Sequence, residues 1–178
     1  MPETLFHFSE DPSIEVFRPR HAEGREGEPP CVWAIDAPHA PLYWFPRDCP
    51  RITFWAGPDT TPEDRERFLG LGHAARVHVT ENAWLERLRS VELYVYNFAP
   101  EPFELHPEPG GFYVAHTEVV PTSCEPVGDL LMRHADAGIE LRFTPSLGPL
   151  QRAVTGSSLQ FSMVRLRNAL PEPQSASS

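Results

Sequence analysis

The sequence contains no lysine, and all 15 of its basic residues are arginine. We attribute this mainly to the codon bias of a GC-rich genome, although arginine also suits bidentate contacts with phosphate. Acidic residues outnumber arginine by 25 to 15, so the formal net charge is −10. Sequence-independent binding to a phosphate backbone requires a surplus of basic side chains. General nucleic-acid binding is therefore not expected, whereas a local basic pocket for a small ligand is compatible with the composition.

Cysteine is also scarce, with only Cys31, Cys49 and Cys124. No pair has the CxxC spacing of a metal or redox motif, so neither a disulfide framework nor a metal site is predicted. No stretch approaches the roughly 18 apolar residues of a membrane span, and the N-terminus lacks a basic region followed by an apolar run. We expect a soluble cytoplasmic protein without membrane association, and the sequence leaves its oligomeric state open.

Proline, by contrast, is abundant, with 21 residues spread along the 178-residue chain. Each proline fixes φ and removes a backbone donor, which favours many short elements joined by rigid turns over a helical bundle. The length suits one domain with a real core. We predict a single globular domain over residues 1–170 and a disordered tail over residues 171–178.

Hydrophobic periodicity and turn residues predict an α+β fold, with a mixed, mostly antiparallel split sheet and short covering helices. Residues 10–30 are expected to form a long polar loop, and such loops are often either functional covers or mobile insertions. Residues 159–168 fit either a strand or a helix. The expected strands are residues 5–9, 31–35, 51–56, 76–80, 92–98, 103–105, 112–115, 118–121 and 140–144, and the expected helices are a short one after Asp36 and residues 61–70, 81–89, 127–137 and 147–154.

The chain is organised around residues 31–56, where two apolar strands flank an aromatic, proline-punctuated segment. This segment carries Arg47 and Arg51 on either side of Cys49. The arginines could lower the pKa of the thiol and favour a reactive thiolate, or clamp a pyrophosphate through bidentate hydrogen bonds. A proline-bounded turn with a buried cysteine and structural arginines is the third alternative.

His7 lies in the middle of the first strand, between two phenylalanines. A polar ring in such a place requires a hydrogen-bond partner. It could orient a ribose hydroxyl or act as a base near neutral pH, or it could be a satisfied, half-buried histidine with no function.

Other polar and aromatic residues also have two interpretations. Asp36 and His39 stand three residues apart on a short helix and could form a charge-assisted pair, or a helix cap beside a surface histidine. Tyr43 could be a stacking platform or a core aromatic. His116 and Glu118 alternate onto one face of a short strand, either as a site or as solvated side chains.

Three blocks of sequence carry a family resemblance: LFHFSEDPSIEVFRPR, VWAIDAPHAPLYWFPRDCPR and FYVAHTEVVPTSCEPVGDLL. They resemble an uncharacterised bacterial domain-of-unknown-function family, and the likeness spans the chain from about Leu5 to Asn168. That family has no established activity. More distantly, the layout looks like the ADP-ribosyltransferase-like superfamily, in which a first strand ends in a histidine motif, a second precedes a helix with a tyrosine, and a late strand carries a glutamate.

This second resemblance implies NAD as the cofactor and an NAD-binding, ADP-ribosyltransferase-like enzyme. It implies that His7 holds the adenine-side ribose, that Tyr43 stacks on nicotinamide, and that Glu118 stabilises the positive charge that develops on the sugar or orients the acceptor. The chain departs from the superfamily in its His-Phe-Ser, where many members have His-Gly-Thr. A non-catalytic α+β module for a small ligand or a protein partner is the alternative, and a hydrolase or cyclase of another type is a third option. The expected cofactor contacts are His7, Ser9, Arg18, Asp36, His39 and Arg47.

Overall fold

The computed structural model describes residues 2–22, 27–70, 72, 74–108 and 110–171. It is a mixed α+β structure with two mostly antiparallel sheets and a few short helices, which confirms the predicted fold class. The chain forms two compact units. The first comprises Met1–Arg47 and Val91–Gly128, and the second comprises Asp48–Ser90 and Asp129–Ser178.

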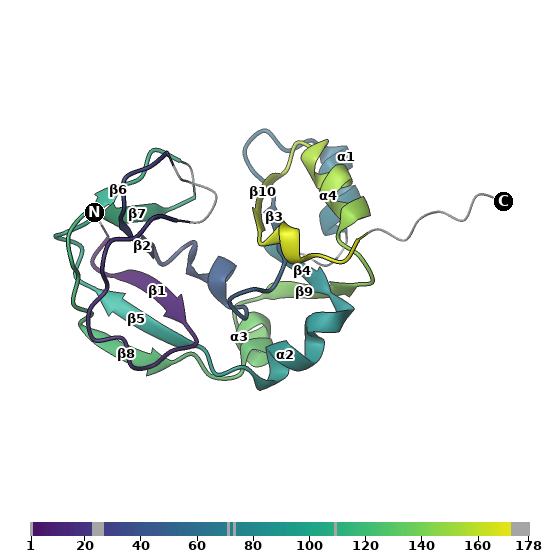
Figure 1. The fold of residues 1–178 in the computed structure, drawn as a ribbon. Coiled ribbons are helices and arrows are strands. Elements are labelled where there is room, and N and C mark those ends of the chain that lie inside the picture. The colour runs from purple at the N-terminus through teal and green to yellow at the C-terminus, as the bar shows by residue number, and fades with distance from the viewer. Residues whose placement is uncertain (1, 23–26, 71, 73, 109, 172–178) are drawn as a thin grey trace. The chain divides into compact units, whose positions relative to one another are not determined.

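The first unit contains a six-stranded sheet (Figure 1). Its strands are Leu5–Ser9 (β1), Val32–Ile35 (β2), Tyr94–Phe98 (β5), Glu104–Leu105 (β6), Phe112–Ala115 (β7) and Ser123–Pro126 (β8). They lie in the order β6-β7-β2-β1-β5-β8, and every pair is antiparallel. A short 3₁₀ helix, Ala40–Tyr43 (η1), follows β2.

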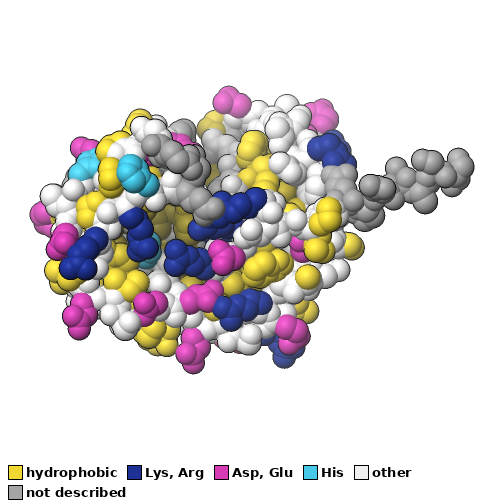
Figure 2. Space-filling view, in the orientation of Figure 1, with side chains coloured by type: hydrophobic (Ala, Val, Ile, Leu, Met, Phe, Trp, Pro, Cys, Tyr) yellow, Lys and Arg dark blue, Asp and Glu magenta, His cyan; other side chains and the backbone are white. Residues whose placement is uncertain are grey.

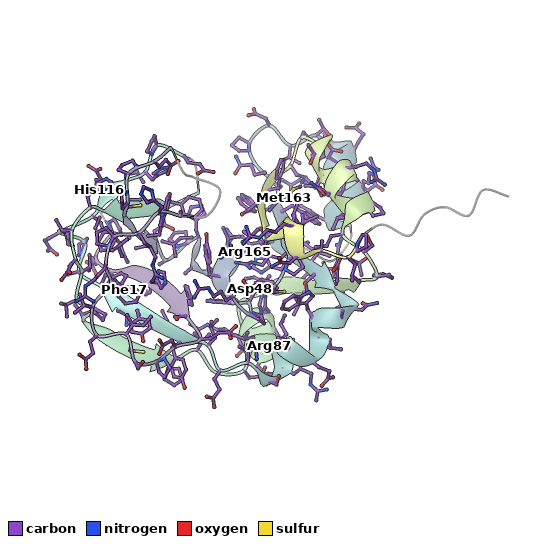
Figure 3. The ribbon with its side chains drawn as sticks, in the orientation of Figure 1. Phe17, Asp48, Arg87, His116, Met163 and Arg165 are labelled. Atoms are coloured by element: carbon purple, nitrogen blue, oxygen red, sulfur yellow. The ribbon has the colours of Figure 1, made fainter. Side chains whose placement is uncertain are left out.

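The two faces of this sheet differ. Because side chains alternate along a strand, Leu5 and His7 point to one face and Phe6 and Phe8 point to the other. The face with His7 carries the core of the unit, and Phe17 from the long loop packs onto it (Figure 3). Burial of each such aromatic or aliphatic side chain stabilises the fold by about 1.5–3 kcal/mol. The buried cluster consists of Leu5, Phe17, Val32, Ala34, Tyr96, Phe98, Phe103, Ala115 and Val119.

The second unit contains a four-stranded sheet in the order β10-β3-β4-β9. Its strands are Arg51–Trp55 (β3), Arg76–Glu81 (β4), Ile139–Thr144 (β9) and Gln160–Val164 (β10). Among the strands that the structure describes, β4 and β9 form the one parallel pair. The helices are Pro62–Asp64 (α1), which continues as a π-helical turn Arg65–Leu69 (η2), Asn82–Trp84 (η3), Leu85–Ser90 (α2), Leu130–Asp136 (α3), Gly148–Thr155 (α4) and Leu166–Asn168 (η4).

One face of this sheet is apolar and the other is polar, although both are buried. Ile52 lies opposite Val79 on the apolar face, which packs against η2 and α4. Figure 1 shows α1 and α4 on one side of the sheet and α2 and α3 on the other. On the polar face, Thr53 lies opposite His78, and the His78 side chain contacts His134 of α3. The second unit therefore buries an imidazole pair in its core.

Most predicted elements are present, and the exceptions have physical reasons. The helix expected from residue 127 begins at Leu130, because Asp129 caps it by accepting from the backbone N–H groups of Leu131 and Met132. Of the strand expected at residues 118–121, only Val119 forms a bridge, and the paired strand follows at Ser123–Pro126.

Three further predictions concern residues 159–168, the helix after Asp36, and the long loop and C-terminal tail. The ambiguous residues 159–168 form a strand and then a 3₁₀ turn. The helix after Asp36 is a 3₁₀ helix that starts only at Ala40. Residues 172–178 of the predicted tail, and residues 23–26 of the predicted loop, lie outside the part of the chain that the structure describes.

Candidate functional site

His7 sits where strands β1 and β2 part. The pairing of these two strands is that of Phe6 with Ile35. Next to this pair, the Nδ1 atom of His7 lies 2.9 Å from the carbonyl oxygen of Trp33. A carbonyl oxygen can only accept, so Nδ1 carries the proton. In the neutral ring, Nε2 is therefore a hydrogen-bond acceptor. Within the described residues, no group bonds to Nε2 of His7.

The surroundings of His7 keep its imidazole neutral. Burial lowers the pKa of His7, and the positive charges of Arg20 and Arg47 lower it further, against the opposing effect of the Trp33 carbonyl. Arg20 and Arg47 are exposed. Within the described part of the chain, neither guanidinium group forms an ion pair or a hydrogen bond. Figure 2 shows arginine side chains grouped on the drawn face of this unit. A neutral hydrogen-bond acceptor, Nε2 of His7, is thus combined with two guanidinium groups, those of Arg20 and Arg47, that are available to a ligand.

Asp36 and His39 form a second polar group in the first unit. Their Oδ1 and Nδ1 atoms are 2.6 Å apart, and Oδ1 also accepts from the backbone N–H of His39. Gly111 lies directly against this pair, with a φ of +72°. A Cβ atom at this position would collide with both side chains. The predicted charge-assisted pair is therefore present, and the same carboxylate caps the turn.

Tyr43 does not share a face with His7. Its ring stacks on Phe8 at 6.4 Å and meets Phe112 edge-on at 6.5 Å between centroids. Phe8 is the neighbour of His7 along β1, so the alternation of the strand places Tyr43 on the opposite side of the sheet. Tyr43 packs among aromatic side chains there, as the core alternative predicts.

Glu118 lies elsewhere again. Phe17 and Val119 form an antiparallel bridge and bury their side chains in the core. Arg18 and Glu118 follow on the outer side of that bridge, where Nε of Arg18 donates to Oε1 of Glu118 at 2.9 Å. Their side chains are 71% and 59% exposed. The structure therefore does not bring Glu118 together with His7 or Tyr43.

Some of the remaining predicted cofactor contacts have other partners, and one of them influences His7. The Ser9 hydroxyl is buried and accepts from the backbone N–H of Asp11, which stabilises the turn after β1. Arg18 is occupied by Glu118. Of the predicted contacts other than His7, only Arg47 contributes to its electrostatic surroundings. Arg20, which is not among the predicted contacts, also lowers the pKa of His7.

Cys49 is a structural residue. It is fully buried in the second unit, and its sulfur lies 3.1 Å from the hydroxyl of Thr80. Burial raises the pKa of Cys49 to about 11, so the thiol is protonated near neutral pH. Arg51 is also buried and donates to the carbonyl oxygen of Cys49. For Cys49 and Arg51 the structure supports the third alternative, a turn with a buried cysteine and a structural arginine, whereas Arg47 is exposed.

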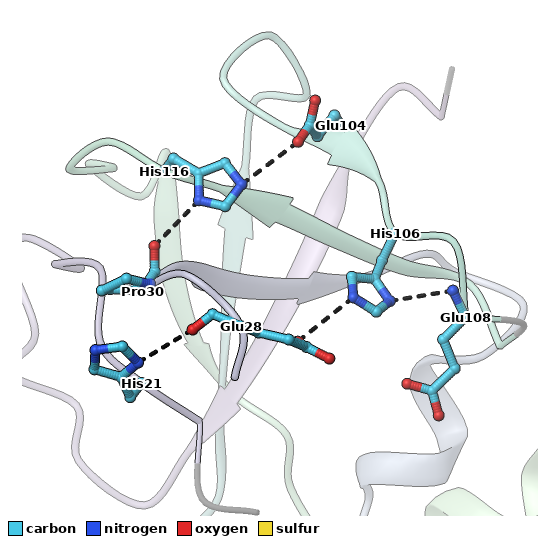
Figure 4. A network of polar contacts seen from close by, with 7 residues as sticks. All are labelled: His21, Glu28, Pro30, Glu104, His106, Glu108 and His116. Atoms are coloured by element: carbon cyan, nitrogen blue, oxygen red, sulfur yellow. Dashed lines mark hydrogen bonds and ion pairs between the residues drawn. The ribbon is translucent and has the colours of Figure 1, made fainter. Parts of the chain in front are cut away.

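A network of histidines and glutamates at one end of the first sheet was missed from the sequence (Figure 4). His116 lies between the carbonyl oxygen of Pro30 and the carboxylate of Glu104, so it does not pair with Glu118 as its position suggested. His106 accepts from the backbone N–H of Glu108 and faces Glu28. These contacts join segments far apart in sequence, which no local pattern reveals.

Across the described residues, no group of three or more His, Cys, Asp or Glu side chains could hold a metal ion.

Comparison with known proteins gives a family but no activity. No curated protein and no solved structure matches the chain. Within the described ranges, no helix is long and apolar enough to cross a membrane. One family model, described as a family of unknown function, matches residues 6–169, which include His7, the Asp36–His39 pair and both sheets except the first residue of β1. The chain belongs to this family of unknown function, DUF6886.

Proposed function

We propose that the protein is an NAD-binding enzyme of the ADP-ribosyltransferase-like kind, with its nucleotide site at His7. The observation that carries this proposal is the neutral imidazole whose Nε2 accepts, next to the uncommitted cations Arg20 and Arg47. A sugar hydroxyl can donate to Nε2. A pyrophosphate can accept from the guanidinium groups in bidentate geometry.

The proposed nucleotide site differs from the set of residues that the sequence predicted. Tyr43 and Glu118 lie on other sides of the first unit, so the proposed site no longer includes them. His7 holds a ribose hydroxyl, and Arg20 and Arg47 hold the phosphates. Transfer chemistry also needs a group that handles the acceptor proton, and this role falls to residues other than Glu118.

Calorimetric titration with NAD tests the site. We expect saturable binding by the wild-type protein and a loss of at least about tenfold in affinity for His7→Ala, since a hydrogen bond to a sugar and the packing of the ring are both removed. Arg20→Gln and Arg47→Gln should each weaken NAD and ADP-ribose but leave nicotinamide unaffected. His116→Ala is the matched control, because its Nδ1 also faces a backbone carbonyl oxygen.

The outcomes separate the two functions that the sequence left open. Absence of binding by the wild-type protein would overturn the proposed site. Binding that His7→Ala and His116→Ala weaken equally would also overturn it. Binding without any release of nicotinamide would instead identify a non-catalytic module for a small ligand.

A further inference from the structure

We propose that Asp36 and His39 form a carboxylate–imidazole dyad in which His39 is the general base that activates the acceptor. This inference rests on the proposed function and adds to it a residue for the proton transfer. The Nδ1 atom of His39 lies 2.6 Å from Oδ1 of Asp36. A carboxylate fixes the proton on Nδ1, so Nε2 presents its lone pair outward.

Backbone and side-chain contacts hold Asp36 and His39 in this arrangement. The backbone N–H of Asp36 donates to the carbonyl oxygen of Gly111, which continues the pairing of β2 with β7 by one residue. Oδ1 of Asp36 accepts from the backbone N–H of His39 as well as from its ring. Gly111 leaves the space that both side chains occupy. Two segments of the first unit, the turn from Asp36 to His39 and the backbone at Gly111, therefore hold the carboxylate and the imidazole in place.

The dyad also remains accessible. The side chains of His39 and Asp36 are 26% and 18% exposed. No partner for Nε2 of His39 occurs among the residues that the structure describes. The other histidine–carboxylate contacts of this unit are longer, at 3.5 Å for His116 and 3.6 Å for His106. Among the described histidine–carboxylate contacts of this unit, that of His39 alone has the short distance of a charge-assisted hydrogen bond.

Strand register places the dyad near His7. Phe6 pairs with Ile35, so Asp36 is the diagonal neighbour of His7 across the two strands. Diagonal neighbours in an antiparallel pair have separations of about 7–8 Å. That spacing lies within one nucleoside. In this inference the ribose at His7 is the nicotinamide ribose, in place of the adenine-side ribose that the superfamily resemblance implies, so its reacting carbon can face the side on which the dyad lies.

The proposed step is the reaction of NAD with water or another O–H acceptor. The acceptor oxygen forms a bond to C1′ of the nicotinamide ribose and gives its proton to Nε2 of His39. The C1′–N bond breaks, its electron pair passes to the ring, and nicotinamide leaves as a neutral molecule. The imidazolium, stabilised by Asp36, then releases the proton to solvent. Asp36 acts through His39 and is a positioning residue.

Two measurements test the dyad. In ¹⁵N spectra of the imidazole groups, His39 should show a protonated Nδ1 and an unprotonated Nε2, with the signal assigned from His39→Gln. Asp36→Asn should abolish this tautomer preference, and Asp36→Glu should retain part of it. This readout does not depend on NAD. A mixture of tautomers in the wild-type protein would contradict the dyad.

The second measurement is nicotinamide release from NAD in water, followed by chromatography. We expect His39→Gln to lower kcat by about 100-fold or more, as removal of a general base does, with NAD affinity changed by less than twofold. His116→Gln is the control and should leave both values unchanged. Asp36→Asn should lower kcat, and Asp36→Glu should restore part of it.

Different results would contradict the NAD site at His7 and the role of the Asp36–His39 dyad. If the wild-type protein binds NAD and releases nicotinamide but His39→Gln does so at the same rate, the dyad role is wrong and the nucleotide site stands. Binding without turnover also overturns the dyad role. If the wild-type protein binds no NAD, the proposed function fails, and the role of the dyad with it.

Discussion

The Nδ1 atom of His78 lies 3.0 Å from the Nε2 atom of His134, and both rings are buried in the second unit. Nδ1 of His134 faces the carbonyl oxygen of Leu130 at 2.7 Å, so it carries a proton, and Nε2 must accept. His78 is then the donor in the pair. This chain of hydrogen bonds requires His134 to be neutral, because its Nε2 must accept.

The pair predicts that acid destabilises the protein. Burial lowers the pKa of both histidines, and His134, Arg76 and Arg51 lower that of His78 further. The unfolded chain, with pKa values near 6.5, therefore binds more protons than the folded protein. The stability contributed by the pair is complete above that value and is lost as the pH falls below it, with a limiting slope of about 1.4 kcal/mol per pH unit for each histidine.

Urea unfolding at several pH values between 5 and 8 measures this effect. His134→Gln should lower the free energy of unfolding at the upper end of the range and reduce its dependence on pH. His21→Gln is the control, because His21 is exposed. Parallel curves for the wild-type protein and His134→Gln would show that the pair does not cause the acid sensitivity.

The three cysteines should differ in reactivity. Cys31 and Cys49 are buried, and Cys124 is exposed. Because the pKa of Cys49 is raised to about 11, its thiolate is rare near neutral pH. Native protein treated with a thiol-specific disulfide reagent should show one fast thiol, and Cys124→Ser should remove that phase. In denaturant all three should react. A fast phase that persists in Cys124→Ser but disappears in Cys49→Ser would restore the reactive-thiolate interpretation.

Gly111 should tolerate substitution less well than Gly138. Both have positive φ values, +72° and +65°, so alanine costs about 1–2 kcal/mol of backbone strain at either position. Nothing lies within 4 Å of a Cβ added to Gly138, whereas one added to Gly111 meets Asp36 and His39. Gly111→Ala should therefore lower the free energy of unfolding by about 1–3 kcal/mol more than Gly138→Ala. Equal losses would mean that the dyad moves aside freely.

Arg18 and Glu118 should contribute little to stability and nothing to NAD binding. Exposed ion pairs are screened by solvent and have coupling energies of about 0.2–1 kcal/mol. A double-mutant cycle with Arg18→Ala and Glu118→Ala should fall in this range and shrink at high salt. Calorimetry should find NAD affinity unchanged in Glu118→Gln. A large loss of affinity would return Glu118 to the nucleotide site.

The sequence predicts the elements of this fold better than the contacts between them. Alternation identified β1 and β4, and the turn composition before residue 112 indicated β7. Cap chemistry identified the helix after Thr61, whose hydroxyl accepts from the backbone N–H of Asp64. Strand β8 was missed because its residues, SCEP, have low strand propensity and lie at the edge of the sheet beside β5. Its pairing comes from tertiary context.

The candidate site was predictable only where its residues are close in sequence. Asp36 and His39 are three residues apart, so their spacing revealed the pair. Arg18 and Glu118 are 100 residues apart, and His78 and His134 are 56 apart, so no local pattern connects them. Buried Glu81 is similar, since its carboxylate accepts from the backbone N–H groups of Leu147 and Leu170. Such contacts depend on the path of the chain between elements.

That path has a consequence for biosynthesis. The chain leaves the first unit after Arg47, returns at Val91, and leaves again after Gly128. Strand β1 pairs with β5 along its whole length, so His7 emerges from the ribosome long before its main neighbour Tyr96 exists. The first sheet becomes complete only once Pro126 has been synthesised. Until Tyr94–Phe98 has been synthesised, the edge of β1 that pairs with β5 stays unsatisfied, and such an exposed strand edge is prone to aggregation.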